Sequence, residues 1–422
     1  MPVVELIRLL GQTAAAAVLR FDFLLIIGVV LLMVYTQYQR AAMLEQRLFG
    51  FVRNRPGEQL VQSVLDGILG GAIATVVFVV MGVSLNEVGI WYLWGLALLL
   101  MLVQPRFMCF SYGAGILALS HLILGVPSID VPALMALVAV LHLVEAVLIL
   151  LSGARSASPL YVRSGRGDVV GAFSLQKFWP LPFIALIGAA VPVEILQGVP
   201  AVDMPDWWPI IRPSQPAPPG MEYAFALFPV VAALGYGDIA VTRAPAVKAR
   251  QTSARLLLYS AGLLALAVLS QHGWVWAFLA ALYSPLVHEW VIRTARRSEL
   301  EGEPKFAGRE TMVLDVHPDS PAARGGVQPG DIILAVNGIR VATRQDLADA
   351  MTPWAFDVKV EVENGLTGER RTLLCPGKVP PLGVLLVPGA DGGLYLDLRE
   401  RPRWQRLLDR WARFWSTRSL RR

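Results

Sequence analysis

Charged residues are scarce in this chain of 422 residues: Asp, Glu, Lys and Arg make up 16% of it, while 55% is hydrophobic. Soluble domains carry about 25% charged residues, so a chain built only of such domains is excluded. The long apolar runs lie between Phe21 and Trp290, whereas the residues after Arg293 have the composition of a soluble domain. We therefore expect a membrane-embedded part followed by a soluble part that begins near residue 300.

Cysteine is equally rare. The two cysteines are Cys109, inside an apolar run, and Cys375, in the soluble part. Such a pair excludes a disulfide framework, so the soluble part can lie in a reducing compartment. The first residues lack the order of a cleaved signal peptide, because Glu5 precedes Arg8. Residues 1–20 are expected to remain as an amphipathic or interfacial segment.

Nine apolar stretches approach the roughly 20 residues that a helix needs to cross a bilayer. The sixth contains Pro180, Pro182 and Pro192, which a membrane helix tolerates only where neighbouring groups satisfy the freed carbonyls. The predicted fold class is a polytopic α-helical membrane domain with eight or nine spans, covering residues 21–297. The predicted spans are residues 21–38, 64–85, 88–103, 107–126, 131–151, 178–197, 221–240, 255–271 and 273–292.

Arg and Lys in the short loops predict the orientation. Three loops are rich in them and are expected in the cytoplasm: residues 39–63, 152–177 and 241–250. The loops between them, at residues 84–89, 126–130, 197–220 and 271–273, carry little positive charge and are expected outside. Arg293, Arg296 and Arg297 then place the C-terminal part in the cytoplasm. Nine spans leave the N-terminus outside beside Arg8 and Arg20, so eight spans with a re-entrant or interfacial N-terminus stay open as the alternative.

The soluble part has a specific order of local signals. Ser320 and Pro321 predict the start of a short helix, and Asn337-Gly338 predicts a hairpin. Thr343 and Asp346 predict a capping box that opens a second helix. This order resembles that of bacterial PDZ domains, and the resemblance implies a small mixed α/β PDZ domain over residues 305–400.

The resemblance also implies a peptide-binding groove. In PDZ domains a Leu-Gly-apolar segment holds the terminal carboxylate of a peptide, and Leu382-Gly383-Val384 matches it here, at the C-terminal end as in site-2-type proteases. A bound peptide would add a strand by β-augmentation. The implied groove residues are Leu382, Gly383, Val384, Leu385, Leu386, Leu347, Ala350 and Met351. The alternative, that these apolar residues form only the domain core, stays open.

Ionisable residues in the apolar runs are candidates for chemistry. His288-Glu289 begins like a zinc-protease motif, but Ile292 replaces the second histidine, and no G-x-S-x-G motif is present. His121, His142 and Glu145 could ligate a metal or relay a proton, although hydrogen bonds between helices explain them more simply. We therefore expect no catalytic residue, no metal and no cofactor. A divergent or inactive site-2-type metalloprotease is the alternative function.

Residues 401–422 form a basic segment with aromatic residues at helical spacing. Such a helix fits the surface of an anionic membrane, and packing against the PDZ domain is the alternative. The residues predicted at the membrane surface are Trp404, Arg406, Arg410, Trp411, Arg413 and Trp415.

Several spans followed by a cytoplasmic PDZ domain resemble the MinJ family of bacterial division-site proteins. A second similarity is the segment after the first span, which contains Tyr38, Gln39, Arg40, Glu45, Arg47 and Leu48-Phe49-Gly50. The resemblance implies a non-enzymatic scaffold in the cell membrane, at the septum or poles, that recruits division proteins through the PDZ groove. Anionic lipid is a further expected partner, nucleic acid is not expected, and a homo-oligomer is left open.

Overall fold

The computed structural model describes residues 2–196, 201–214, 217–351, 355–365, 367–389 and 395–397. The chain forms two compact units. Unit 1 comprises Met1–Ser158 and Phe173–Arg297, and unit 2 comprises Pro159–Ala172 and Ser298–Arg422.

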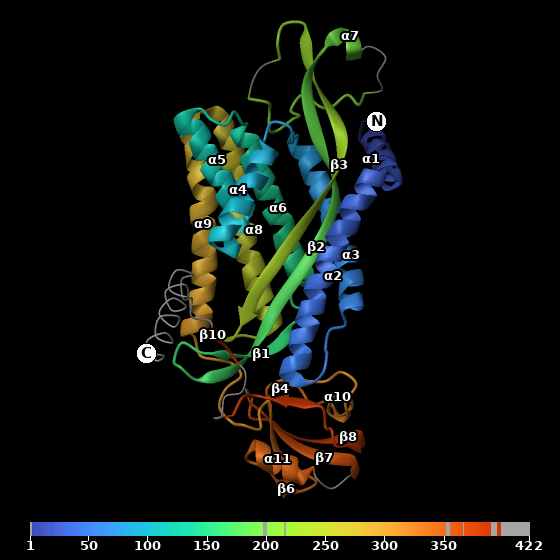
Figure 1. The fold of residues 1–422 in the computed structure, drawn as a ribbon, viewed down its shortest axis with the longest axis vertical. Helices are drawn as coiled ribbons and strands as arrows, with labels where there is room; N and C mark the ends of the chain where they lie inside the picture. Colours follow the sequence, from blue (N-terminus) through green and yellow to red (C-terminus); the bar gives the residue numbers. More distant parts are fainter. Residues whose placement is uncertain are drawn as a thin grey trace, which may run out of the picture. The chain divides into compact units, whose positions relative to one another are not determined.

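Unit 1 consists mainly of helices (Figure 1). Among the described residues, five helical segments are long and apolar enough to cross a membrane: Phe21–Phe49, Pro56–Met81, Val131–Ser152, Pro245–His272 and Trp274–Glu301. The helices are α1 (Pro2–Leu19), α2 (Phe21–Phe49), α3 (Pro56–Met81), α4 (Ile90–Val103), η1 (Pro105–Met108), α5 (Phe110–Leu124), α6 (Val131–Ser152), α7 (Val193–Leu196), α8 (Pro245–Leu269), η2 (Ser270–His272) and α9 (Trp274–Glu301).

These five segments correspond to five of the nine predicted spans. The predicted spans at residues 88–103 and 107–126 are the shorter apolar helices α4 and α5, with 14 and 15 residues. At 1.5 Å per residue each is about 20 to 25 Å long, which is less than the hydrocarbon thickness of about 30 Å.

The predicted helical spans at residues 178–197 and 221–240 are wrong. These residues lie mostly in a long antiparallel hairpin formed by β2 (Val169–Pro192) and β3 (Met221–Ala240), with register from Phe173 opposite Ala240 to Pro192 opposite Met221. The hairpin runs beside α2 and α3 (Figure 1). Most of β2 in unit 1 is buried on both faces, so its sequence is almost continuously apolar and lacks the alternation of a half-buried strand.

The edge of β2 that faces away from β3 is bonded to side chains. The amide of Ile184 donates to Thr75 Oγ1 at 2.9 Å, and the amide of Gly188 donates to Ser84 Oγ at 2.9 Å. In an antiparallel ladder the amide and carbonyl of one residue face the same way, and the direction alternates along the strand. The even-numbered residues of β2 therefore face away from β3.

All four prolines of the hairpin occupy such outward positions. Pro180, Pro182 and Pro192 are even-numbered residues of β2, and Pro229 lies opposite the outward residue Ile184. Proline has no amide hydrogen, so a strand accepts it only where no ladder bond is lost. The residues that would break a helix here thus fit a strand without cost to its pairing.

Helix α3 approaches β2 through glycines. A Cβ atom at Gly67 would overlap the carbonyl oxygen of Pro180, and one at Gly71 would overlap that of Pro182. Only a hydrogen atom fits at either position, which lets the helix backbone lie against the strand. Gly70 adds to the same face, where a Cβ would contact Leu181 and Leu148 at under 3 Å.

Unit 2 is a small mixed α/β fold. One sheet has the order β6-β5-β7-β8, and a second pairs β4 with β9. The PDZ part of the unit contains β4 (Val313–Val316), α10 (Pro321–Gly325), β5 (Asp331–Val336), β6 (Ile339–Arg340), α11 (Arg344–Ala350), β7 (Ala355–Asn364), β8 (Arg370–Val379) and β9 (Val384–Leu386). Strand β1 (Ser158–Arg163) pairs in parallel with β10 (Leu396–Asp397).

The local signals of unit 2 are confirmed. The Ser320 side chain accepts a hydrogen bond from the Ala323 amide and caps α10. Thr343 and Asp346 form the capping box of α11. Asn337 and Gly338 have φ of 50° and 79°, the left-handed values that a tight two-residue hairpin requires.

Candidate peptide-binding groove

One backbone edge of β9 faces away from its partner strand β4. Its other edge pairs with β4, because the His317 amide donates to the Gly383 carbonyl and the Val387 amide donates to the Met312 carbonyl, both at 2.9 Å. The alternation of an antiparallel ladder then turns Val384 and Leu386 away from β4. The outward amide and carbonyl of Val384 are therefore placed to pair with an added strand.

Helix α11 begins beside the end of β9. Arg344, at its first turn, donates from Nη2 to the Val387 carbonyl oxygen at 2.7 Å. This bond holds the start of the helix beside the end of β9. Ala350 and Met351 at the end of the helix pack against the same core cluster as Val384.

The Leu382-Gly383 loop directly precedes β9. Gly383 has a φ of +83°, and a Cβ atom there would overlap the Ser320 side chain. The Leu382 carbonyl accepts from the Ala322 amide at 3.1 Å. Gly383 is therefore required by the backbone and by its contact with Ser320, in addition to any role in letting a peptide approach.

The predicted groove residues divide into two groups. Leu347, Leu382 and Leu386 are buried in the core of the domain, with exposed fractions of 2%, 2% and 7%. The others are half-buried and stay accessible at its margin: Gly383, Val384, Leu385, Ala350 and Met351. The first group therefore packs the core, and peptide binding by the second group stays a prediction.

Tyr161 contacts the end of β9, and no pattern in the sequence predicts this contact. Its hydroxyl donates to the Leu386 carbonyl oxygen at 2.8 Å. Burial raises the pKa of Tyr161, so the hydroxyl is a neutral donor at physiological pH. The residue lies on β1, about 220 residues before β9 in the chain, and no local motif links the two. Its contact occupies the Leu386 carbonyl, one of the outward backbone groups of β9.

Residues 312–362 match the PDZ domain family. The chain is 27% identical over 265 residues to a protein of Bacillus subtilis (strain 168), the cell division topological determinant MinJ. The chain is MinJ-like, with a PDZ domain in its C-terminal part. The aligned region covers 61% of this chain and 62% of MinJ, so the chain matches less than two thirds of the relative's length.

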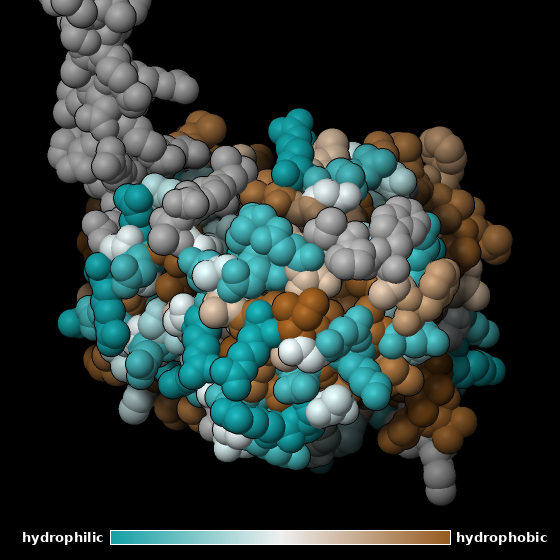
Figure 2. All heavy atoms as spheres, turned by 90° about the horizontal axis from the view of Figure 1, so that it is seen from below, coloured by the Kyte–Doolittle hydropathy of each residue, from teal (hydrophilic) through white to brown (hydrophobic). Residues whose placement is uncertain are grey.

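The surface of unit 2 suits a domain in water. Hydrophilic side chains cover much of the face drawn in Figure 2, and apolar side chains lie between them and along the right side of the view. Ile339, Phe356 and Leu374 are more than half exposed, and they lie on different strands. The predicted membrane-surface residues between Trp404 and Trp415 lie outside the described residues.

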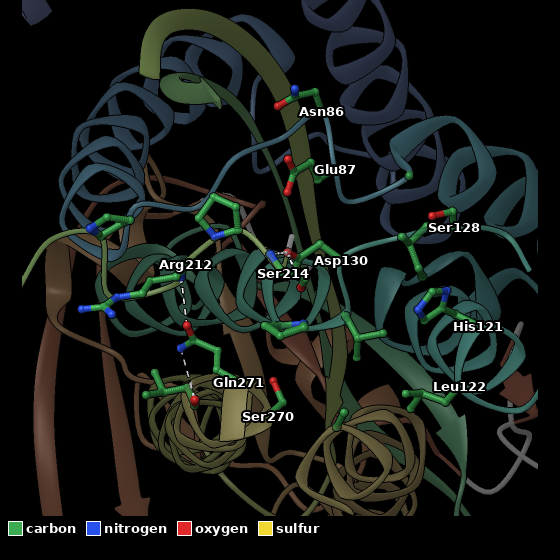
Figure 3. Close-up of a pocket in the computed structure, with 18 of the residues that line it drawn as sticks. Asn86, Glu87, His121, Leu122, Ser128, Asp130, Arg212, Ser214, Ser270 and Gln271 are labelled. Carbon is green, nitrogen blue, oxygen red and sulfur yellow. Dashed lines mark hydrogen bonds between the residues drawn. The ribbon is translucent and has the colours of Figure 1, made fainter. Parts of the chain in front are cut away.

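The four loops predicted to lie outside the cell meet around one cavity of unit 1, of about 1470 Å³ (Figure 3). Asp130 joins two of these loops, because its carboxylate accepts from the Ser214 hydroxyl at 2.7 Å, and it also caps α6 by accepting from the Ala133 amide at 2.8 Å. Gln271 joins a third loop to these two, because its side-chain oxygen accepts from the Arg212 amide at 2.9 Å. The polar groups of the cavity therefore connect the loops to one another.

The candidates for chemistry are placed differently from the prediction. His121 lines the cavity and its Nδ1 lies 2.9 Å from the Pro127 carbonyl oxygen, whereas His142 is buried in α6 beside Cys109 and His288. Glu289 is held by Tyr112, Arg106 and Arg293, at 2.6, 3.2 and 2.5 Å. These bonds occupy the glutamate that a zinc protease would use as its base.

Proposed function

We propose that this chain is a non-enzymatic membrane scaffold that recruits proteins through the groove between α11 and β9, in the placement of the division site or the assembly of the septum. The observation that carries the proposal is the outward backbone of Val384 together with the half-buried Met351, which packs against the same core cluster. An open strand edge supplies affinity for a peptide backbone, and an apolar wall supplies a pocket for its side chain.

The setting of the groove supports a role in division. The similar protein of Bacillus subtilis is named a cell division topological determinant, and this chain carries apolar helices that would anchor it in a membrane. We place the PDZ domain on the cytoplasmic side, because Arg293, Arg296 and Arg297 follow the last apolar stretch. The basic tail at residues 401–422 would add contact with anionic lipid.

The proposal includes the absence of hydrolysis. Ile292 stands where a zinc protease needs its second histidine, and the hydrogen bonds and ion pairs of Glu289 hold it away from a role as a base.

Crosslinking in the native bacterium tests the proposal. A photoreactive amino acid at Leu385, on the groove strand, should capture a division protein, while the same group at the exposed Leu374 on β8 should not. Capture at Leu385 should disappear when Met351→Asp is added. Equal capture from both positions, or capture that survives Met351→Asp, would show that recruitment does not use the groove.

A further inference from the structure

Three ligand-type side chains converge inside unit 1. The Sγ atom of Cys109 lies 3.2 Å from Nε2 of His142 and 3.6 Å from Nε2 of His288. The three ligand atoms all lie within 4.8 Å of one another. The residues come from the N-cap of α5, the middle of α6 and the middle of α9, so the fold, and no local sequence motif, brings them together.

The orientation of His142 is fixed by the backbone. Its Nδ1 lies 2.8 Å from the Val138 carbonyl oxygen, which requires a proton on Nδ1. The lone pair of the neutral ring is then on Nε2, which points at Cys109. A hydrogen bond from the distal ring nitrogen to a carbonyl is the usual support of a metal-binding histidine.

The geometry points to a transition-metal site in which Cys109, His142 and His288 bind one zinc ion. Bonds of about 2.3 Å to sulfur and about 2.0 Å to nitrogen, at tetrahedral angles, separate the two ligand atoms by about 3.6 Å. The observed separations from sulfur are 3.2 and 3.6 Å, so an ion can enter with small side-chain shifts. Thiolate and imidazole are the ligands that zinc prefers, whereas magnesium and calcium prefer oxygen.

The two histidines are buried among packed side chains, and Cys109 is half-buried. His142 and His288 are 4% and 8% exposed, and their rings pack edge to face with centroids 5.1 Å apart. Tyr259 packs against both rings, and its hydroxyl lies 2.8 Å from Ser111 Oγ. Ser111 in turn donates to the Ser284 carbonyl at 2.5 Å. Helices α5, α8 and α9 are thus already joined beside the site, which keeps the ligands in place.

Zinc would join three helices of the membrane part. Binding releases the thiol proton of Cys109 and leaves the fourth position of the ion for a further ligand. The ion would therefore contribute to the stability of the α5, α6 and α9 assembly, separately from the PDZ groove. This role is independent of the proposed scaffold function.

The experiment uses the full chain, purified in detergent with a non-metal-affinity tag and dialysed against a weak chelator. Elemental analysis should find about one zinc per chain. Cys109→Ser, His142→Gln and His288→Gln should each lower this content about tenfold or more, while His121→Gln, outside the cluster, should keep it. No zinc in the wild type, equal zinc in all variants, or copper in place of zinc would overturn the assignment.

Cobalt substitution of the wild-type protein tests the ligand set even if a cluster variant misfolds. Wild-type protein loaded with Co²⁺ should show the thiolate-to-cobalt charge-transfer band of a cysteine ligand, and Cys375→Ala should show it too. Cys375 is a suitable control because it is the other free thiol and lies in unit 2. A wild-type cobalt spectrum without that band would contradict the proposed ligand set.

Discussion

The hydroxyl group of Tyr38 contacts both the amide and the carbonyl group of Phe178. It accepts from the Phe178 amide at 3.1 Å and lies 3.3 Å from the Phe178 carbonyl oxygen, although the residues are 140 positions apart. Phe178 is an outward residue of β2, so its amide and carbonyl have no partner on β3. One side chain of α2 therefore satisfies a strand edge that would otherwise be costly away from water.

Replacing this hydroxyl should destabilise unit 1. Tyr38→Phe leaves the Phe178 amide without its partner, and Tyr38 is 1% exposed, so we expect a loss of about 1 to 3 kcal/mol. Thermal unfolding of the purified protein, followed by near-ultraviolet circular dichroism, measures the change. Tyr35→Phe, one turn earlier on α2, is the matched control, and equal unfolding temperatures for both variants would contradict the account.

The β2–β3 hairpin could not be predicted from the sequence alone. Residues 178–197 and 221–240 have the length and apolarity of membrane helices, and burial on both faces of β2 hides the alternation that identifies a strand. The available signal was the prolines: Pro180, Pro182 and Pro192 share one parity, which a strand accepts at outward positions. This shared parity identifies a strand only when it is known that α2 and α3 supply hydrogen-bond partners for the outward backbone groups.

The soluble unit was more predictable, because its signals are local. Ser320, Thr343 with Asp346, and Asn337-Gly338 each act within a few residues, and all form the predicted caps and turn. Contacts between distant residues were not predictable. Neither Tyr161 beside Leu386 nor Cys109 beside His288 is marked by any spacing in the sequence.

The PDZ domain is expected in the cytoplasm. The arginines at 293, 296 and 297 should hold the end of α9 on that side, because positive residues resist translocation. A fluorescent protein that folds only in the cytoplasm, fused after Arg422, should be bright, and an alkaline phosphatase at the same point should be inactive. The reverse pattern would contradict the predicted orientation.

Acid should loosen the start of α11. Hydrogen bonds from the amides of Ala342 and Thr343 lower the pKa of Asp346 below its usual range. A carboxyl whose pKa is lower in the folded state than in the unfolded state stabilises the folded state. This contribution is complete when the pH is above the unfolded-state pKa, and it is lost as the pH falls through the folded-state pKa. Hydrogen exchange of α11 should therefore accelerate in acid in the wild type and depend less on pH in Asp346→Asn. Identical pH profiles would show that the capping box does not act this way.

Gly383 should not accept a side chain. Gly383→Ala forces a non-glycine residue to a φ of +83° and into Ser320, which should destabilise the domain by about 2 to 4 kcal/mol. Limited proteolysis of the full chain should cleave unit 2 faster in this variant. Gly389→Ala is the control, since a Cβ there would only touch Glu310 at 3.6 Å. Unchanged cleavage of Gly383→Ala would mean that the loop has another conformation.

The most direct test of the scaffold is the affinity of the full chain for the C-terminal peptide of the protein captured at Leu385. Met351→Asp puts a charge at the apolar wall and should weaken binding by about 1 to 3 kcal/mol, or roughly 5- to 150-fold in Kd. Leu374→Asp, at a side chain that is 55% exposed on β8, should leave Kd unchanged. If the folded Met351→Asp protein binds the peptide as tightly as the wild type, the groove between α11 and β9 is not the recruiting surface.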